Sequence, residues 1–392
     1  MTLNEVAWAV APAYIFLNWK FDRNVEDMLR AFRGVYANMN LGYSYKTNYT
    51  PYACESVDRH GCYAEVVSPM EYDYALAMGV SPEHIIFNGV CKTAEAIRKA
   101  ILGGSIINAD NAADFRNIVR ESDRVGKNPR VGIRMNFDIG TGHGSRFGVT
   151  FGGNEFQKIM ALAKTGIKIS GLHCHLSYTR TVESFRRRAE RMIDIADAFD
   201  GLDYIDLGGK LFGRMSPEFA KQFPETPPTF EDYGSAIGSI FKAAFPDESV
   251  ELIVEPGTAL VSDCMNMATR VMYLKEVDGA IYAGVDASQY DLGFAGEFKS
   301  PPYRVLRASC WGKEICCSIV GCTCVETDIL TKEHKGRIQE GDIVMYENVG
   351  AYTCNLSRQF IKPSLPVVEY DGESYTEVKP ALPIAAKTSN NF

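Results

Sequence analysis

The sequence lacks the features that would assign the chain to a membrane, a secretory route or a nucleic acid. No apolar run approaches the roughly 18 residues that a membrane-spanning helix needs. The opening "MTLNEVAWAVAPAYIFLNWKF" has neither the basic segment nor the cleavage site of a signal peptide. Basic residues form no long run and the net charge is −8, so nucleic acid is not expected as a partner. These absences predict a soluble, cytoplasmic protein.

A regular cysteine framework is also missing. The eleven cysteines are odd in number and scattered, which suits a reducing cytoplasm better than a set of disulfides. Cys322 and Cys324 form a C-x-C pair, and His173 and His175 flank Cys174. Neither group comes with a second ligand pair at a familiar zinc spacing. We therefore expect no bound metal.

What the sequence does contain is a repeated strand-then-helix pattern. With 392 residues the chain is expected to hold two domains, because single cores rarely exceed about 250–300 residues. Eight strand candidates precede residue 258: "GYSYK", "CYAEVVS", "HIIFNG", "GSIINAD", "VGIRMNF", "KISGLHCHL", "YIDLGG" and "VELIVEPG". Eight such units over about 230 residues match a (β/α)₈ barrel. A doubly wound sheet would more often place a glycine-rich turn after its first strand, whereas the glycine pair here follows the seventh.

Helical patterns fill the gaps between these strands. "SPMEYDYALAMG" and "TAEAIRKAIL" open on the N-cap candidates Ser68 and Thr93. "SFRRRAERMIDIADAFDG" is expected to end at Gly201, as a glycine just past a helix does.

Beyond about residue 270 the pattern changes to short alternating runs without helices, such as "AIYAGVDAS" and "GDIVMYENVGAYT". This predicts an all-β domain, and the early strand candidate "AYIFLNWKF" could join it. The last residues, "PIAAKTSNNF", are expected to be a loose tail. The predicted architecture is therefore an α/β protein with a TIM-type barrel over 24–270 and an all-β domain from 1–23 and 271–392.

Polar residues and glycines gather where the barrel strands should end. Active sites of such barrels are built at the C-terminal ends of the strands. Taken singly, each residue there has an ordinary explanation, such as a solvated lysine, a core histidine or a tight turn. Together they place a lysine, histidines, an arginine, a glycine pair and a carboxylate at one rim: Lys46, Ser68, Asn88, Gly89, Asn108, Arg134, Asn136, His173, His175, Gly208, Gly209 and Glu255.

This combination of residue types suits a phosphorylated pyridine cofactor. Phosphate sites of such barrels recur in the loops after strands seven and eight, where "DLGGK" and "EPGT", with Gly257, are found. A carboxylate can keep a pyridine nitrogen protonated, a lysine can form a Schiff base, and an imidazole can cover the ring. Pyridoxal 5'-phosphate is the common cofactor that uses all of these groups.

The motifs also resemble a known family over nearly the whole chain. "YSYKTN", "SRFGV", "GLHCHL", "DLGGK", "EPGTALV", "GCTCVETDIL" and "GDIVMYENVGAYT" occur in the order typical of the fold-type III decarboxylases, which include diaminopimelate, ornithine and arginine decarboxylases. The resemblance implies a barrel with a β domain, bound pyridoxal phosphate, and a head-to-tail homodimer with active sites at the interface.

The same resemblance implies roles for individual residues. Lys46 is expected to form the Schiff base and His175 to stack on the cofactor ring, while Glu255 pairs with the ring nitrogen. The remaining cofactor-binding candidates are Gly208, Gly209, Gly257 and Tyr352 at the phosphate, and Arg134 near the ring. Cys324 is expected to reach in from the partner subunit and protonate Cα after CO₂ loss. Arg146 and Asp328 are expected to form an ion pair across the dimer interface.

Several positions depart from the family pattern. Lys210 stands where a third glycine is usual, and Thr258 where an arginine commonly follows "EPG". Val325 stands where an acid usually grips the distal ammonium of the substrate, and Glu326 beside it should face the other way on a strand. The substrate therefore stays open: an amino acid or an amino-acid conjugate.

The sequence predicts a pyridoxal-phosphate-dependent amino-acid decarboxylase. A carboxylate at Glu255 makes the ring a strong electron sink, which favours decarboxylation over the racemisation catalysed by relatives with an arginine there. The alternative from another class is a non-catalytic relative that binds partners. Such relatives tend to lose the lysine or the phosphate contacts, and this chain has both.

Overall fold

The computed structural model describes residues 1–142, 144–310 and 313–381. They form two compact units. The barrel unit comprises the described residues of 22–213 and 225–260, and the sheet unit comprises 1–21, 214–224 and the described residues from 261 onward. The domain limits expected from the sequence stay a prediction, because a compact unit need not be a separately folding domain. The expected tail "PIAAKTSNNF" lies outside the described residues.

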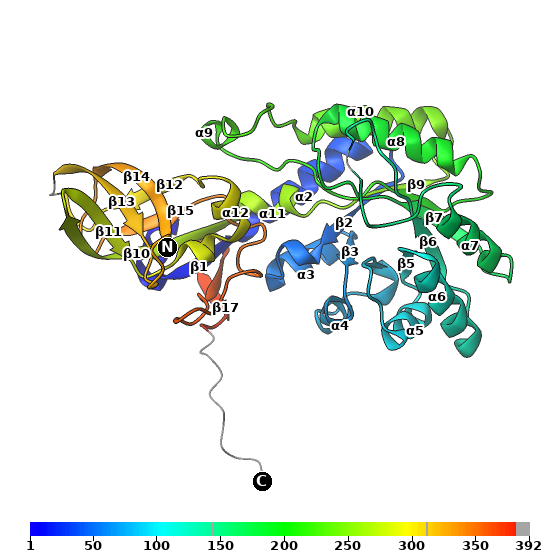
Figure 1. Ribbon diagram of the computed structural model, residues 1–392, viewed down its shortest axis with the longest axis horizontal. Helices are drawn as coiled ribbons and strands as arrows, with labels where there is room; N and C mark the ends of the chain where they lie inside the picture. Colours follow the sequence, from blue (N-terminus) through cyan, green and yellow to red (C-terminus); the bar gives the residue numbers. More distant parts are fainter. Residues whose placement is uncertain (143, 311–312, 382–392) are drawn as a thin grey trace, which may run out of the picture. The chain divides into compact units, whose positions relative to one another are not determined.

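The barrel unit contains a closed ring of eight parallel strands in chain order, which confirms the predicted (β/α)₈ barrel. Figure 1 shows these strands at the centre of their helices. The ring closes where Met39 on the first strand pairs with Leu252 on the last. The strands are β2 (Met39–Ser44), β3 (Tyr63–Val66), β4 (Ile85–Phe87), β5 (Ile106–Ala109), β6 (Arg130–Arg134), β7 (Ile169–His173), β8 (Tyr204–Asp206) and β9 (Glu251–Val254).

A large tyrosine fills the interior of the barrel. Tyr204 packs in one apolar cluster with Tyr63, Ile86, Ile106 and Ile253. Its ring fits because two facing strand positions are glycines: a Cβ at residue 171 would lie 2.3 Å from the ring, and one at residue 132 would lie 2.2 Å from the hydroxyl. The barrel interior is therefore packed, as in other barrels of this kind.

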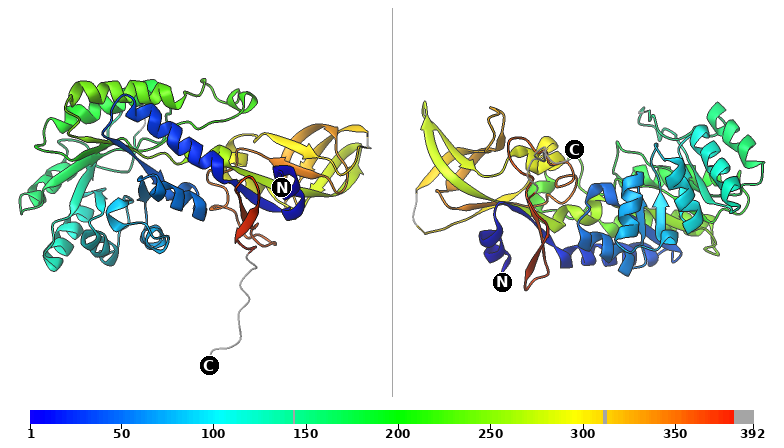
Figure 2. Two further views of the ribbon diagram at one scale, coloured as in Figure 1. Left: turned by 180° about the vertical axis from the view of Figure 1, so that it is seen from behind. Right: turned by 90° about the horizontal axis from the view of Figure 1, so that it is seen from below.

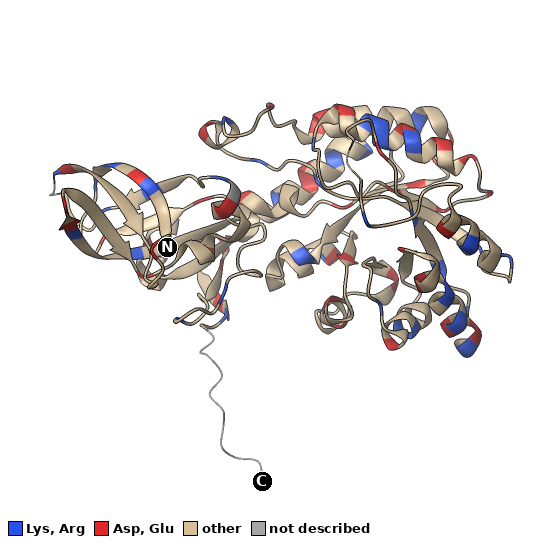
Figure 3. Ribbon diagram, viewed as in Figure 1, with Lys and Arg blue, Asp and Glu red and all other residues tan. Residues whose placement is uncertain are grey.

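Helices surround the strands, and their starts follow the expected caps. Ser68 and Thr93 accept hydrogen bonds from the backbone of Glu71 and Ala96, so both predicted N-caps are confirmed. The helices are α2 (Asn18–Arg33), α3 (Pro51–Arg59), α4 (Pro69–Ala77), α5 (Ala94–Gly103), α6 (Ala112–Val125), α7 (Asn154–Ala163), α8 (Val182–Ala196) and α10 (Phe230–Ala244), with 3₁₀ turns η1 (Tyr45–Thr47) and η2 (Pro82–His84). Basic and acidic residues are interspersed along these helices (Figure 3).

The end of α8 differs from the prediction. The helix ends at Ala196 and not at Gly201. The amides of Ala198 and Phe199 bond to carbonyls three residues back, so the last turn tightens and the α-helical pattern stops early. Gly201, with φ 64°, serves the turn that leads into β8.

The sheet unit is built on nine strands, and the N-terminal strand belongs to them as expected. β1 (Ala13–Leu17) lies between β10 (Met265–Val277), to which it is antiparallel, and β16 (Val367–Tyr370), to which it is parallel. Figure 2 shows this blue strand among the yellow and red ones. The others are β11 (Ala280–Val285), β12 (Tyr303–Leu306), β13 (Glu314–Val320), β14 (Ile329–Arg337), β15 (Ile343–Tyr346) and β17 (Tyr375–Lys379).

The candidate "AYIFLNWKF" is only half strand, because α2 begins at Asn18. From there the buried apolar positions follow a helical spacing: Phe21, Val25, Met28, Leu29 and Phe32. The prediction of an unbroken strand over this segment was wrong.

The sheet unit also carries short helical segments that the sequence pattern did not indicate. α1 (Leu3–Val10) contributes Val6 and Ala7 to the core of this unit, beside Ile15 and Met345. The other segments are α9 (Pro217–Ala220), α11 (Thr258–Val261), which begins in the barrel unit, α12 (Gly293–Phe298), η3 (Ser262–Cys264) and η4 (Gln289–Leu292). Among the described helices of the whole chain, none has the length and apolar character needed to cross a membrane.

Candidate active site

Lys46 lies just beyond the end of β2, in the 3₁₀ turn η1, and not within the strand as "GYSYK" suggested. The chain turns here because the amide of Asn48 bonds to the carbonyl of Tyr45. The turn directs the lysine amine toward the neighbouring strand. Its Nζ lies 2.5 Å from Oε2 of Glu65 and 3.3 Å from Oγ of Ser44.

Glu65 begins a polar network across the carboxyl end of the barrel. It comes from β3 and is almost fully buried. Nδ2 of Asn88, which follows β4, donates to Oε1 of Glu65 at 3.1 Å and to Oε1 of Glu255 at 2.5 Å. The side-chain amide of Asn88 therefore connects Glu65, beside Lys46, to Glu255, which follows β9.

The network continues behind Asn88. Its Oδ1 accepts from Nδ2 of Asn108 at 2.8 Å, and Oδ1 of Asn108 accepts from the hydroxyl of Tyr204 at 2.7 Å. These partners fix the orientation of the two amides, so the groups they present to Glu65 and Glu255 are pre-positioned.

Glu255 is a buried carboxylate flanked by two histidines. Its Oε2 lies 3.4 Å from Nε2 of His173 and 4.0 Å from Nδ1 of His175. Both rings approach the same carboxylate, although β7 ends at His173 and His175 therefore does not lie on a strand face as expected. Burial opposes ionisation of Glu255, but His173 and Lys46 outweigh it, so the pKa lies well below the ordinary value. This carboxylate is therefore ionised.

His175 is held in its neutral form. Burial lowers the pKa of its imidazole well below the usual range, and the positive charge of Lys46 acts in the same direction. Its Nδ1 accepts the amide hydrogen of Gly209 at 3.1 Å, which requires that nitrogen to be unprotonated. The side chain is 25% exposed, so one part of the ring remains accessible.

A second buried carboxyl, Asp206 at the end of β8, lies beside Glu255. Burial and the charge of Glu255 raise the pKa of Asp206 well above its ordinary value. Asp206 therefore favours its protonated form beside the ionised Glu255. Among the described residues, His173, Asp206 and Glu255 bring one ligand atom each within 4.8 Å of one another, so the expectation that the chain binds no metal stays a prediction.

The loop after β8 carries the glycine pair. A Cβ at Gly208 would lie 2.2 Å from the carbonyl oxygen of Cys174, and one at Gly209 would lie 2.3 Å from that of Glu255. Both positions therefore need glycine for backbone packing alone. The Gly208 amide donates to Asp206 at 2.8 Å and the Gly209 amide to His175. To bind a phosphate, the two amides would have to release Asp206 and His175 and donate to the phosphate oxygens instead.

A fully buried arginine supports this loop from behind. Arg188, on α8, donates to the carbonyl oxygens of Leu207 at 2.8 Å, Gly209 at 3.0 Å and Leu176 at 3.2 Å. Its guanidinium also lies 4.1 Å from the ring centre of Phe185. Arg188 thereby fixes the loops after β7 and β8 to one another and adds a buried positive charge beneath them.

The other glycine and arginine candidates lie at the same end of the barrel. A Cβ at Gly257 would lie 2.1 Å from Oγ1 of Thr47, so the turn after β9 packs against η1. Arg134 ends β6, with Nη1 3.3 Å from Oδ1 of Asp110 and its guanidinium 4.8 Å from the ring centre of Phe147. Their roles toward a cofactor stay predictions.

Arg146, the predicted interface residue of the barrel unit, lies next to Phe147. Its guanidinium is 4.0 Å from the centre of that ring.

Cys324 and Asp328 belong to the sheet unit. Cys324 is exposed in the connection between β13 and β14. Asp328 is buried and accepts hydrogen bonds from Ser288, Gln289 and Thr323 of its own chain, so it shapes the loop that carries Cys324. An ion pair between Asp328 and Arg146 of a second subunit stays a prediction.

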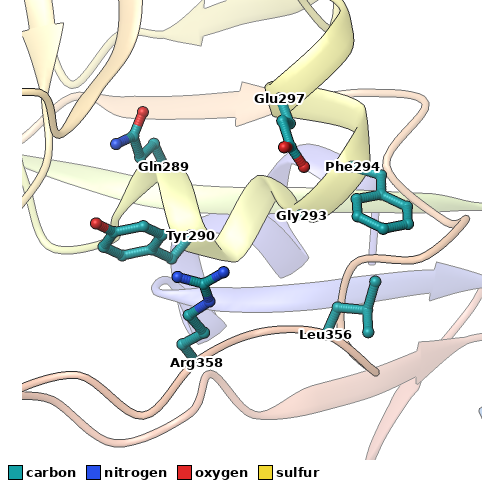
Figure 4. Close-up of a pocket in the computed structure, with 8 residues that line it drawn as sticks. Gln289, Tyr290, Gly293, Phe294, Glu297, Leu356 and Arg358 are labelled. Carbon is teal, nitrogen blue, oxygen red and sulfur yellow. The ribbon is translucent and has the colours of Figure 1, made fainter.

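Tyr352, the remaining candidate, also belongs to the sheet unit and lies beside a pocket of that unit. Its ring centre is 5.8 Å from that of Phe294, one of the pocket residues. The pocket has a volume of about 390 Å³. Figure 4 shows three of the side chains that line it, those of Tyr290, Glu297 and Arg358.

Sequence reasoning missed three residues of the site: Glu65, Asp206 and Arg188. Glu65 and Asp206 could have been noticed in the sequence, because each is an acid within an otherwise apolar barrel strand and must find a partner there. Arg188 gave no such signal, because an arginine within "SFRRRAERM" reads as part of a solvated helix face.

The residues gathered at this rim fit pyridoxal phosphate by their chemistry. They supply a primary amine, a neutral imidazole with an accessible edge and an ionised buried carboxylate. The loop beside them holds glycines and a buried arginine. Fold and donor set together define a pyridoxal-phosphate enzyme of the barrel type.

A comparison of the sequence with protein families gives the same answer. The model described as "Pyridoxal-dependent decarboxylase, pyridoxal binding domain" matches residues 22–262, more than half of the chain. The chain therefore belongs to the pyridoxal-dependent decarboxylases. It is a carboxy-lyase of that family and its cofactor is pyridoxal phosphate.

Similar proteins extend over both units. The diaminopimelate decarboxylase of Aquifex aeolicus is 23% identical over 377 residues, which cover 92% of this chain and 86% of that protein. The crystal structure of diaminopimelate decarboxylase from M. jannaschii has a TM-score of 0.85 at 21% identity and covers 97% of this chain and 92% of its own. That of the Helicobacter pylori enzyme complexed with L-lysine has a TM-score of 0.81 at 22% identity, with coverages of 95% and 94%. At these identities, the structural likeness shows a shared fold.

Proposed function

We propose that the protein decarboxylates an α-amino acid, or a conjugate of one, with Lys46 as the cofactor lysine. The bound cofactor supplies an electron sink for the electrons left on Cα when CO₂ departs. The rest of the chemistry belongs to the residues of the chain. Lys46 Nζ is the amine that binds the cofactor covalently, and Glu65, 2.5 Å away, accepts and holds its proton.

The observation that carries the proposal is the state of Glu255. It is buried, ionised and oriented by Asn88 and His173, and the neighbouring Asp206 has a raised pKa that favours its protonated form. An ionised carboxylate facing a pyridine nitrogen keeps that nitrogen protonated. The ring is then a strong electron sink, which decarboxylation needs more than racemisation does.

The remaining groups would position the reactants. His175, neutral and partly exposed, would cover the ring face of the cofactor without adding charge. Gly208, Gly209 and Gly257 would receive its phosphate, with Tyr352 adding a hydrogen bond, and Arg134 would lie near the ring. Cys324 of the partner subunit would donate the proton to Cα.

The substrate class is inferred from the relatives and from the positions at which this sequence departs from the family pattern. The relatives named above act on diaminopimelate, and one of their structures holds L-lysine. Val325 and Thr258 replace the acid and the arginine expected for such a diamino acid. We therefore infer an amino acid whose distal end is not a free ammonium, such as a conjugate.

We further propose that the active form is a homodimer with shared sites, in the cytoplasm. Support for the dimer comes from the resemblance alone. Support for the compartment is that none of the eleven cysteines forms a disulfide.

A substrate panel tests the proposal. Purified protein with added pyridoxal phosphate is incubated with free and conjugated amino acids in deuterated water, and CO₂ and products are followed by mass spectrometry. Release of CO₂ with formation of an amine carrying one deuterium at Cα is expected for one substrate class. Deuterium exchange without CO₂ would indicate a racemase, and the absence of both would indicate a binding protein.

A further inference from the structure

The residue directly after the glycine pair, Lys210, has a backbone conformation that glycine favours. Its φ is 85°, in the left-handed region where a Cβ is strained. A side chain kept in such a conformation points to a use for that side chain.

Lys210 also brings two hydrogen-bond donors without acceptors. Within the part of the chain that the structure describes, neither its backbone amide nor its Nζ has a hydrogen-bond acceptor or a carboxylate within ion-pair distance. The residue is half-buried. Backbone amides of folded proteins are normally satisfied, so the unpaired amide of Lys210 can receive a ligand, and its partly exposed ammonium can bind the same ligand.

A second cation acts on Lys210 electrostatically. Burial and the positive charge of Arg180, in the loop after β7, lower the pKa of Lys210 to about 8. The hydroxyl of Tyr233 donates to the carbonyl oxygen of Arg180 and accepts from the amide of Phe212 at 3.3 Å. The guanidinium of Arg180 lies 5.1 Å from the ring centre of Phe212. These contacts connect the loop after β7, which carries Arg180, to the loop after β8, which carries Lys210. Both cations therefore lie at the same end of the barrel.

We propose that Lys210 and Arg180 form an oxyanion-binding subsite beside the glycine pair. The backbone amide and ammonium of Lys210 and the guanidinium of Arg180 would bind one phosphate or carboxylate group, which removes the repulsion between the two cations. Naming the source of this group rests on the proposed function: it is the phosphate of the cofactor or a distal anionic group of the substrate. The subsite itself is independent of turnover.

The subsite is tested first with sulfate, whose charge is constant near neutral pH. Calorimetric titration of the cofactor-free protein at pH 7 should show binding that is weakened about tenfold in Lys210→Met. Lys210→Gly, which also relieves the backbone conformation, should show the same weakening in a more stable protein. Lys210→Arg should retain binding, and Lys168→Met, at the start of β7, should leave it unchanged.

The source of the anion is then distinguished in the same variants. If the cofactor supplies it, Lys210→Met loses affinity for pyridoxal phosphate but not for pyridoxal, measured by absorbance. If the substrate supplies it, cofactor affinity is retained and the KM rises for substrates with a distal anion but not for neutral ones. Unchanged sulfate affinity in both Lys210→Met and Lys210→Gly would overturn the subsite. This failure is distinct from that of the proposed function, which would appear as a wild-type protein without decarboxylation.

Discussion

Nζ of Lys46 and Oε2 of Glu65 lie 2.5 Å apart although the residues are separated by 19 positions in the chain. The register of two adjacent strands accounts for this, because Ser44 of β2 pairs with Glu65 of β3. The turn η1 after Ser44 then folds Lys46 back over the end of β3. The carboxylate favours the charged form of the amine, so the pair controls when Lys46 can act as a nucleophile.

Replacing Glu65 should therefore change the proton affinity of Lys46. In Glu65→Gln the pH midpoint for reductive alkylation of Lys46, followed by peptide mass spectrometry, should fall by about one to two units. Glu251→Gln, at the opposite end of the barrel, serves as the control and should leave the midpoint unchanged. An unaltered midpoint in Glu65→Gln would show that the ion pair does not control this amine.

A second prediction concerns the raised pKa of Asp206 beside Glu255. The folded protein holds a proton on Asp206 that the unfolded chain releases above about pH 4, so this group lowers stability as pH rises from about 4 toward its raised pKa. Asparagine mimics the protonated acid: its oxygen can accept from Gly208 and its amide can donate to Glu255. Asp206→Asn should therefore raise the urea midpoint at pH 7.5 relative to wild type, and the gain should shrink toward pH 4. A gain that is absent or independent of pH would contradict the assignment of the proton.

A third prediction concerns the support that Arg188 gives to the loop after β8. Arg188→Met leaves three buried carbonyl groups without their donor, so the free energy of unfolding should fall by at least about 3 kcal/mol. Affinity for pyridoxal phosphate should fall as well, because the loop that we propose to receive the phosphate loosens. Arg191→Met, on the exposed face of the same helix, should change stability by less than about 0.5 kcal/mol. Equal effects of the two substitutions would contradict the inference that Arg188 supports this loop.

Most of the barrel could be predicted from the sequence, because its strands are short apolar runs and its helices have clear caps. Ser68 and Thr93 are examples in which one side chain fixes a helix start. The segment around Asn18 could not be predicted in the same way. There a strand changes directly into a helix without a glycine or proline, and only the spacing of the buried residues marks the change.

The candidate site was predictable where residues stand at strand ends, as Lys46, His175 and Glu255 do. Its internal connections were not, because they depend on register between strands. Asn88 contacts both Glu65 and Glu255 only because β3, β4 and β9 end at compatible heights. Arg188 could not be singled out from the sequence, because the other arginines of its helix are exposed.

The fourth prediction concerns the shared active site. If Lys46 and Cys324 act together across a dimer, mixing Lys46→Ala with Cys324→Ala subunits should restore activity that neither variant has alone. Random reassembly makes roughly half of the dimers mixed, each with one intact site, so about a quarter of wild-type activity is expected. No recovery after confirmed subunit exchange would place both residues in one subunit's site.

The most direct experiment identifies the lysine that binds pyridoxal phosphate. The protein loaded with pyridoxal phosphate is reduced with borohydride, digested, and mapped by mass spectrometry, with Lys46→Ala treated in parallel. Lys210 is the chemical rival, since a pKa of about 8 leaves a minor fraction of its amine neutral near pH 7. The buried Lys92 is held by Asp114 at 2.6 Å. We expect the label on Lys46 in the wild type and no stoichiometric label in the variant. A label on Lys210, or one retained in Lys46→Ala, would contradict this assignment.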